Sequence, residues 1–181
     1  TGIGERHVSV GETVVTLASE AARKALEQAG KRAEEIDLIL VATCSPEQYL
    51  PCCACQVQAA VGAVNALAFD VNAACSGFLF ALNTADAYLR TGLAENALVI
   101  GSEVLSKLVD WTDRGTCILF GDGAAAAVVE CREGWPSIGA VLGSRGDDVL
   151  LRLPGLGRGE PNVLSMEGTQ VFKFAVETVP D

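Results

Sequence analysis

The sequence predicts an α/β fold in which helices cover both faces of a mostly parallel sheet. The hydrophobic periodicity alternates between strand-like and helical segments in the order βαβαβ, which is typical of such sheets. The predicted strands are almost continuously apolar, as strands buried on both faces are. Of the 181 residues, 50% are hydrophobic and 20% are charged, a balance that excludes a disordered chain. The length suits one domain with a substantial core.

Apolar periodicity and end signals predict four helices. In the first, residues 13–29, Val14 and Ala18 share one face, and Gly30 supplies a left-handed stop. The other helices are expected at residues 53–61, 76–90 and 167–179.

Strands are expected between and after these helices. Their ranges are 36–42, 66–71, 97–101, 116–120 and 124–129, with an edge strand at 138–142. Gly121, Asp122 and Gly123 have the composition of a tight turn, so the strands beside them are predicted to form an antiparallel hairpin. Residues 146–162 are rich in glycine and proline and are predicted to be a loop.

The charge balance limits the partners that we expect. Thirteen Lys and Arg against 23 Asp and Glu give a net charge of -10, which disfavours binding to the phosphate backbone of nucleic acid. No uncharged apolar run reaches the roughly 18 residues that a membrane span needs, so no membrane is expected. The chain starts at Thr1 without a signal-like segment, and we interpret it as a piece of a longer protein.

The cysteines indicate the compartment and raise the question of a metal. There are seven, and most lie in apolar runs, which favours small buried thiols in a reduced, cytoplasmic protein. Cys52, Cys53 and Cys55 form a cluster, but His7 is the one histidine and no paired CxxC set exists, so no metal is predicted. A metal-binding protein built on this cluster stays an alternative, which elemental analysis for zinc would test.

Cys75 stands in a segment that differs from the rest. In residues 69–78, FDVNAACSGF, a buried strand runs through a tight Ala-Ala turn into a helix that begins next to Cys75. This helix is apolar on several faces and is expected to be buried nearly all round. Its free N–H groups and its dipole would favour the thiolate form of Cys75, which makes it a candidate nucleophile. The alternative is a core cysteine like Cys117 or Cys131, because a strand–turn–helix segment is not diagnostic.

Four segments carry a family resemblance, in the same order along the chain. They are TGIGERH at 1–7, DVNAACSGF at 70–78, TDRGT at 112–116 and FGDGA at 120–124. Together they resemble β-ketoacyl-acyl carrier protein synthase III, a condensing enzyme of the thiolase superfamily that starts bacterial-type fatty acid synthesis. The resemblance covers essentially the whole chain.

The resemblance implies a thiolase-like fold made of two pseudo-equivalent halves. Residues 1–145 would be the N-terminal half, which carries the nucleophile cysteine. Residues 146–181 would be a loop and helix leading into a C-terminal half that this chain lacks. An exposed apolar face is expected where that half would dock.

The resemblance also implies a two-step mechanism and its partners. An acyl-CoA would acylate Cys75, and malonyl-acyl carrier protein would then lose carbon dioxide and attack the acyl group to give a β-ketoacyl-acyl carrier protein. The CoA thioester is a substrate and no cofactor is implied, and the enzyme would be a homodimer. In the family, decarboxylation uses a histidine and an asparagine of the C-terminal half, so poor condensation is expected of these 181 residues. His7 is interpreted as a structural or surface histidine.

Three further residues are carried over as substrate-binding residues. Arg114 matches an arginine at the nucleotide end of CoA, where a guanidinium suits phosphate or a stacked base; its alternative is an ion pair with Asp110 or Asp113. Leu50 matches a residue that reaches across the dimer and limits the acyl pocket. Phe120 is expected to line the active-site channel, with core packing as its alternative.

Two other functions stay open at this point. A polyketide starter-type ketosynthase is hard to separate from the fatty acid enzyme by these motifs. A truncated, non-catalytic module that binds CoA or dimerises is the second. In that case Cys75→Ala would leave ligand binding intact, and no covalent adduct would form.

Overall fold

The structure, a computed structural model, describes residues 2–132, 134, 136, 138–155, 159 and 161–178. The chain divides into two compact units. The larger contains residues 9–103 and 123–142, and the smaller contains residues 1–8, 104–122 and 143–181. The boundary predicted between residues 145 and 146 stays a prediction.

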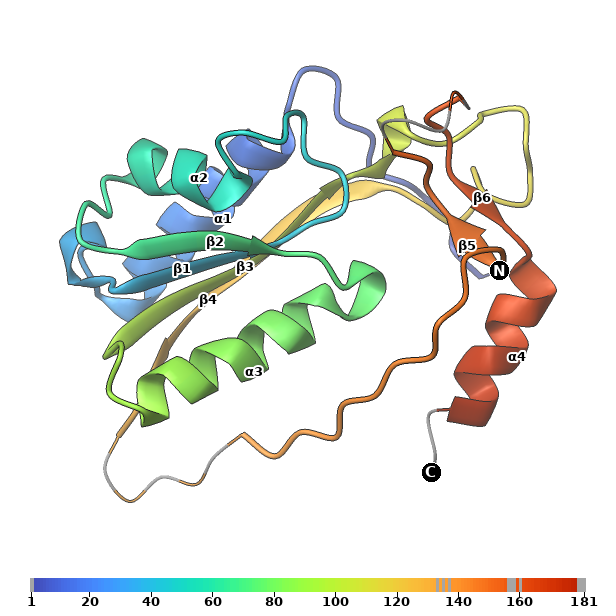
Figure 1. Cartoon of the computed structure of the whole chain (residues 1–181). Coiled ribbons are helices and arrows are strands. Elements are labelled where there is room, and N and C mark those ends of the chain that lie inside the picture. Colours follow the sequence, from blue (N-terminus) through green and yellow to red (C-terminus); the bar gives the residue numbers. More distant parts are fainter. Residues whose placement is uncertain are drawn as a thin grey trace. The chain divides into compact units, whose positions relative to one another are not determined.

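The larger unit is built on a four-stranded sheet with the strand order β2-β1-β3-β4. β1 (Leu38–Ala42) pairs in parallel with β2 (Leu67–Val71) on one side and with β3 (Asn96–Val104) on the other. β4 (Asp122–Glu130) lies beside β3 and runs in the opposite direction (Figure 1). All five residues of β1 are buried, as expected for a central parallel strand. The predicted mostly parallel sheet is confirmed.

Helices cover both faces of this sheet, as predicted. α1 (Val14–Ala29) and α2 (Cys53–Val61) lie on one face, and α3 (Gly77–Arg90) lies on the other (Figure 1). α1 begins after Thr13, whose hydroxyl accepts a hydrogen bond at 3.1 Å from the N–H three residues on and so satisfies a donor without a helical partner. It ends at Gly30, which has φ 64°, and the left-handed stop is confirmed.

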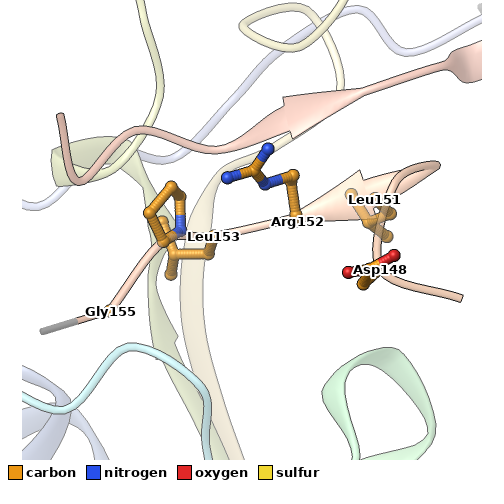
Figure 2. Close-up of a pocket in the computed structure, with 6 residues that line it drawn as sticks. Asp148, Leu151, Arg152, Leu153 and Gly155 are labelled. Carbon is orange, nitrogen blue, oxygen red and sulfur yellow. The ribbon is translucent and has the colours of Figure 1, made fainter. Parts of the chain in front are cut away.

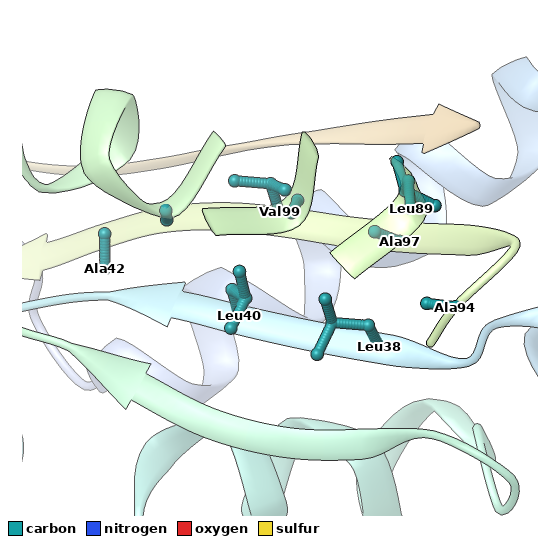
Figure 3. Close-up of a cluster of buried hydrophobic side chains, with 9 residues drawn as sticks. Leu38, Leu40, Ala42, Leu89, Ala94, Ala97 and Val99 are labelled. Atoms are coloured by element: carbon teal, nitrogen blue, oxygen red, sulfur yellow. The ribbon is translucent and has the colours of Figure 1, made fainter. Parts of the chain in front are cut away.

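The core between α3 and the sheet consists of alanines and branched aliphatic side chains (Figure 3). Alternate residues of β1 face α3 because side chains point to opposite faces along a strand. The nine buried members are Leu38, Leu40, Ala42, Ala81, Ala85, Leu89, Ala94, Ala97 and Val99. Small side chains in this core let α3 lie close to the sheet, which determines where its first residue lies.

The described residues of the smaller unit include one α-helix and a short antiparallel ladder. β5 (Leu151–Arg152) pairs with β6 (Ser165–Met166), and α4 (Gly168–Thr178) follows. On α4, Phe172 and Val176 lie four residues apart and are 71% and 62% exposed. Apolar side chains are therefore exposed on this helix, and whether they form the face at which a C-terminal half docks stays a prediction. No helix in the described part of the chain is long and apolar enough to cross a bilayer.

Most elements predicted from the sequence are present within one or two residues of their expected ends, although β3 continues three residues past its own. The helix at 53–61 has the bounds expected, and the helix predicted at 167–179 is α4, with residue 179 outside the described residues.

The hairpin predicted at residues 116–129 was wrong. The N–H groups of Thr116 and Cys117 donate to the carbonyl of Asp113 at 3.2 and 3.0 Å, so residues 116–119 form turns and β4 has no partner strand directly before it. The edge strand expected at 138–142 was also wrong, because these residues lie outside any strand.

Candidate active site

The turn that presents Cys75 is short and strained. β2 ends at Val71, the 3-10 turn η2 (Ala74–Ser76) follows, and α3 begins at Gly77. Ala74 has φ 44°, in the left-handed region that non-glycine residues rarely adopt. Cys75 comes next and is exposed. Strain of this kind is concentrated at functional sites, and a sharp strand-to-helix turn is the device that exposes the nucleophile of hydrolases.

The start of α3 packs closely against the sheet. A Cβ atom placed on Gly77 would lie 3.1 Å from the Cβ of Ala42 at the end of β1. Glycine at this position therefore allows a close approach of helix to strand. Gly101 in β3 also allows α3 to approach the sheet, with somewhat more room, since a Cβ placed on it would lie 3.5 Å from the Phe78 ring. Cys75 thus lies near the carboxyl ends of the parallel strands, where open α/β sheets bind ligands.

One carboxylate holds the segment that follows β1. Glu103, in β3, accepts hydrogen bonds from the Thr43 hydroxyl at 3.2 Å, from the Cys44 N–H at 2.8 Å and from the Ser45 hydroxyl. The three donors belong to consecutive residues, and each makes a charge-assisted hydrogen bond to the carboxylate. The loop after β1 is therefore fixed beside the turn that carries Cys75.

The environment of Cys44 distinguishes it from Cys75. Burial raises the pKa of Cys44 to about 12, and the charges of Glu103 and the neighbouring Cys75 add to the shift. Because the thiolate is the nucleophile, Cys44 is inert at neutral pH. Of these two neighbouring sulfur atoms, the exposed Cys75 is the candidate nucleophile.

Asp70, in the same sequence motif, binds the start of α2. Its carboxylate oxygens accept hydrogen bonds from the N–H of Cys53 at 2.9 Å and of Ala54 at 2.7 Å. These donors belong to the first turn of a helix and have no helical partner, and a negative charge there is favourable. Burial and then the charge of Asp70 raise the pKa of Cys53 to about 12. Asp70 therefore couples α2 to the strand that leads to Cys75.

The expectation that α3 is buried nearly all round was wrong. Its buried residues, Gly77, Ala81, Ala85 and Leu89, recur every fourth position, whereas Leu79 is 60% exposed. A helix that lies on one side of a sheet buries a single stripe. Cys75 accordingly lies at an exposed helix start in this chain.

The carried-over site residues fall in both units. Leu50 and Cys75 belong to the larger unit, and Arg114 and Phe120 belong to the smaller. Leu50 is 85% exposed, and its carbonyl accepts a hydrogen bond from the Gln48 amide at 3.1 Å. Phe120 is half-buried. The substrate roles of all four residues stay predictions.

Arg114 projects from a loop that Asp113 organises. The Asp113 carboxylate accepts hydrogen bonds from the Gly115 N–H and the Thr116 hydroxyl, each at 2.8 Å. Asp110 is engaged by Thr112 in the same way. Arg114 is exposed and has no ion pair with any residue that the structure describes, so the alternative pairing with Asp110 or Asp113 is not formed.

His7 has a backbone role. Its side chain is exposed, and its carbonyl accepts a hydrogen bond from the Asp122 N–H at 2.9 Å. A Cβ placed on Gly121 would lie 3.2 Å from that carbonyl oxygen, so the glycine allows the two segments to meet. The first motif thus pairs with the FGDGA motif through its backbone.

The cysteine cluster does not assemble a metal site. Within the described ranges, no three His, Cys, Asp or Glu side chains form a group that could hold a metal ion. Cys53 is fully buried, while the sulfur atoms of Cys52 and Cys55 lie 3.4 Å apart.

The smaller unit contains a pocket of about 300 Å³ along residues 148–155 (Figure 2). Its lining includes the carboxylate of Asp148 and the guanidinium of Arg152, together with Leu151, Leu153, Pro154 and Gly155. None of these side chains carries a thiol or hydroxyl nucleophile, so we assign it no chemical step.

Sequence reasoning missed Glu103 and Cys44. A signal was present, because Glu103 is an acidic residue in the otherwise uncharged strand NALVIGSEV. A carboxylate in such a strand is expected to have buried polar partners. The residues that follow a neighbouring parallel strand were the candidates for these partners.

Comparison with known proteins shows which proteins this chain is similar to. The family model described as 3-Oxoacyl-[acyl-carrier-protein (ACP)] synthase III matches residues 69–146, which include Cys75, Arg114 and Phe120. The β-ketoacyl-[acyl-carrier-protein] synthase III of Clostridium acetobutylicum is 48% identical over 189 residues, covering 99% of this chain and 58% of that protein. Over nearly its whole length, the chain is similar to β-ketoacyl-[acyl-carrier-protein] synthase III proteins.

Two solved structures of similar proteins have the same fold. The synthase III of Thermus thermophilus is 40% identical with a TM-score of 0.90, over 98% of this chain and 58% of that one. The priming β-ketosynthase of the R1128 polyketide pathway is 35% identical with a TM-score of 0.89, over 98% of this chain and 56% of that one. Among the relatives compared by sequence, the β-ketoacyl-[acyl-carrier-protein] synthase III of Anaplasma marginale is 47% identical over 97% of this chain and 58% of that protein. The chain thus spans somewhat more than half the length of these relatives.

Proposed function

We propose that this chain carries the nucleophile of a condensing enzyme that starts fatty acid synthesis from an acyl-CoA and malonyl-acyl carrier protein. The observation that carries the proposal is the exposed Cys75 on a strained strand–turn–helix segment, inside the residues that the family model matches. The names of the relatives support the reaction class.

In the first step, the Cys75 thiolate attacks the carbonyl carbon of the acyl-CoA thioester. A bond forms between the cysteine sulfur and the acyl carbon, and the bond to the CoA sulfur breaks. CoA leaves as the thiol, taking up the proton that Cys75 has released. The start of α3 supports this step, because free N–H groups at a helix N-terminus stabilise negative charge.

In the second step, malonyl-acyl carrier protein loses carbon dioxide and the electron pair stays on the carbon next to the thioester. This carbanion attacks the acyl carbon on Cys75, and the cysteine leaves as a thiolate, so the enzyme is regenerated. The family resemblance assigns the decarboxylation to a histidine and an asparagine of the C-terminal half. The residues described here would supply the acyl-carrying step, and no cofactor enters either step.

We assign the remaining candidate residues to substrate binding. Arg114, exposed and without an ion pair to a described residue, would bind the phosphate or base of CoA with its guanidinium fork. Leu50, 85% exposed, would contact a second copy of the chain and limit the acyl pocket in a homodimer. Phe120 would line the channel to Cys75. A cytoplasmic location is part of the same proposal.

The proposal is tested on a protein that contains this chain together with its C-terminal half. With acetyl-CoA and malonyl-acyl carrier protein, we expect the β-ketoacyl product by mass spectrometry. Cys75→Ala should abolish it, and Cys131→Ala, at another exposed cysteine, should retain it. Product formation at an undiminished rate by a folded Cys75→Ala variant would contradict the assignment.

A polyketide starter-type ketosynthase is the second candidate, favoured by the similarity to the R1128 priming enzyme. The two functions differ in the acyl-CoA that Cys75 accepts and in the carrier protein that follows. Comparing kcat/KM for acyl-CoA chains of increasing length, with carrier proteins of both pathways, separates them. A non-catalytic module would instead bind CoA without any covalent adduct, in the native chain and in Cys75→Ala alike.

A further inference from the structure

Two cysteines at the start of α2 form a close pair of thiols. Cys52 is the N-cap residue of the helix, and Cys55 lies three residues further on, in the first turn. Their sulfur atoms are 3.4 Å apart, and both residues are half-buried. Residues three apart on a helix are neighbours, so the spacing brings the two side chains together. A disulfide bond requires about 2.05 Å between the sulfur atoms, so closure takes a shift of about 1.4 Å.

The surroundings give the two thiols different roles. The Cys55 thiol lies 3.6 Å from the carbonyl oxygen of Ala68, which accepts its hydrogen. The hydrogen bond that it shares with Cys52, followed by burial, raises the pKa of Cys55. The raised pKa disfavours the Cys55 thiolate, so we assign the first attack to Cys52. The adjacent Cys53 is fully buried, and its pKa of about 12 makes it inert.

We propose that Cys52 and Cys55 form a reversible disulfide when the chain meets a low-molecular-weight disulfide. The Cys52 thiolate attacks one sulfur of the reagent, which releases the first reagent thiolate and leaves a mixed disulfide on Cys52. The Cys55 thiolate then attacks the Cys52 sulfur and releases the second reagent thiolate. The two cysteines lose two electrons and two protons, and the reagent gains both as two thiols.

The disulfide would fix the turn that carries Leu50. The Gln56 side chain already donates a hydrogen bond to the Pro51 carbonyl at 3.0 Å, so the turn is joined to α2 at one point. A disulfide bond between Cys52 and Cys55 would join the turn to α2 at a second point. The inference rests on the geometry of α2 and not on the proposed function.

The experiment equilibrates the folded chain with mixtures of oxidised and reduced glutathione, quenches with acid and alkylates the remaining thiols. Cleavage after acidic residues then isolates residues 48–70, because Glu47 precedes this stretch and Asp70 ends it. This peptide contains Cys52, Cys53 and Cys55 and excludes Cys44 and Cys75. We expect this peptide to carry one alkyl group, on Cys53. Its mass should be two hydrogen atoms lower than that of the reduced peptide with one alkyl group.

Single variants identify the bond. Cys53→Ala should keep the disulfide, whereas Cys52→Ser and Cys55→Ser should each abolish it, with folding verified by circular dichroism. The folded chain should oxidise at a ratio of oxidised to reduced reagent about tenfold lower than the chain in urea. A disulfide that persists in Cys52→Ser, one that needs Cys53, or an equal ratio in folded and unfolded chains would overturn the proposal.

Discussion

Replacing Asp70 by alanine should destabilise the chain through the start of α2. The carboxylate accepts hydrogen bonds from the Cys53 N–H at 2.9 Å and the Ala54 N–H at 2.7 Å. Both donors lie in the first helical turn and lose their partner in the variant, because no helical carbonyl is available to them.

The size of the effect follows from these two contacts. Loss of a helix N-cap side chain costs about 0.5–2 kcal/mol, and a hydrogen bond to a charged group is worth about 1.5–3 kcal/mol. Water can reach part of this site, because Asp70 is half-buried. We therefore expect Asp70→Ala to lower the free energy of unfolding by about 2 kcal/mol. Asp70→Asn keeps one acceptor oxygen and loses the charge, so about 1 kcal/mol is expected.

The assay is urea unfolding followed by circular dichroism at 222 nm, roughly the helix minimum. The midpoint should fall while the slope m stays unchanged, because the native surface is retained. Glu20→Ala is the control: Glu20 is 58% exposed and lies 3.6 Å from Lys24, so a change within about 0.5 kcal/mol is expected. A loss below about 0.5 kcal/mol in Asp70→Ala would refute the capping role.

Four further predictions concern the site. Ala74→Gly relieves a left-handed residue, so in urea unfolding it should leave the chain about 1–2 kcal/mol more stable than the neighbouring Ala73→Gly; equal stabilities would show that the turn is not strained. With a pKa of about 12, Cys44 is deprotonated only as pH approaches that value, so at pH near 8 only about one molecule in ten thousand carries its thiolate and alkylation should be very slow. Glu103→Gln removes one of the charges that raise this pKa and should accelerate Cys44 alkylation measured by peptide mass; an unchanged rate would mean that the carboxylate does not act on the thiol. Arg114→Ala should weaken CoA binding in calorimetry about tenfold or more, and Arg114→Lys should restore part of it if charge contributes; unchanged affinity in Arg114→Ala would remove this residue from the CoA site.

The helices and the parallel strands were predictable because their signals are local. The apolar face of residues 13–29 and the stop at Gly30 depend on periodicity and on one backbone conformation, and both are present in α1. The continuous apolar run that became β1 likewise indicated burial on both faces. Elements of this kind need no knowledge of distant contacts.

The predicted hairpin is absent because its residues form hydrogen bonds with side chains and with distant segments instead. Asp113 binds the residues that follow it and turns 116–119 away from a strand. Asp122, expected in the hairpin turn, instead donates its N–H to the carbonyl of His7 and accepts hydrogen bonds from the N–H and hydroxyl of Ser106. Composition indicated a turn at Gly121 and Gly123, but these partners lie far away in the sequence.

The candidate site was predictable only in part, for the same reason. The strand–turn–helix position of Cys75 followed from local sequence, and the turn has that form. The carboxylate of Glu103 lies in β3 and the half-buried thiol of Cys44 lies in the loop after β1, and these two segments meet only in the folded sheet. The one-sided burial of α3 was also missed, because periodicity cannot show how much of an apolar helix the rest of the chain covers.

The central claim is that Cys75, and not the neighbouring Cys44, receives the acyl group. The most direct measurement incubates the chain with acetyl-CoA, alone and with its complementary half, and cleaves after acidic residues. Cys44 then lies in residues 38–47 and Cys75 in residues 71–86. Our account predicts an acetyl group on the peptide 71–86 alone, and its loss in Cys75→Ala. An acetyl group on the peptide 38–47, or none on either peptide with the complementary half present, would contradict it.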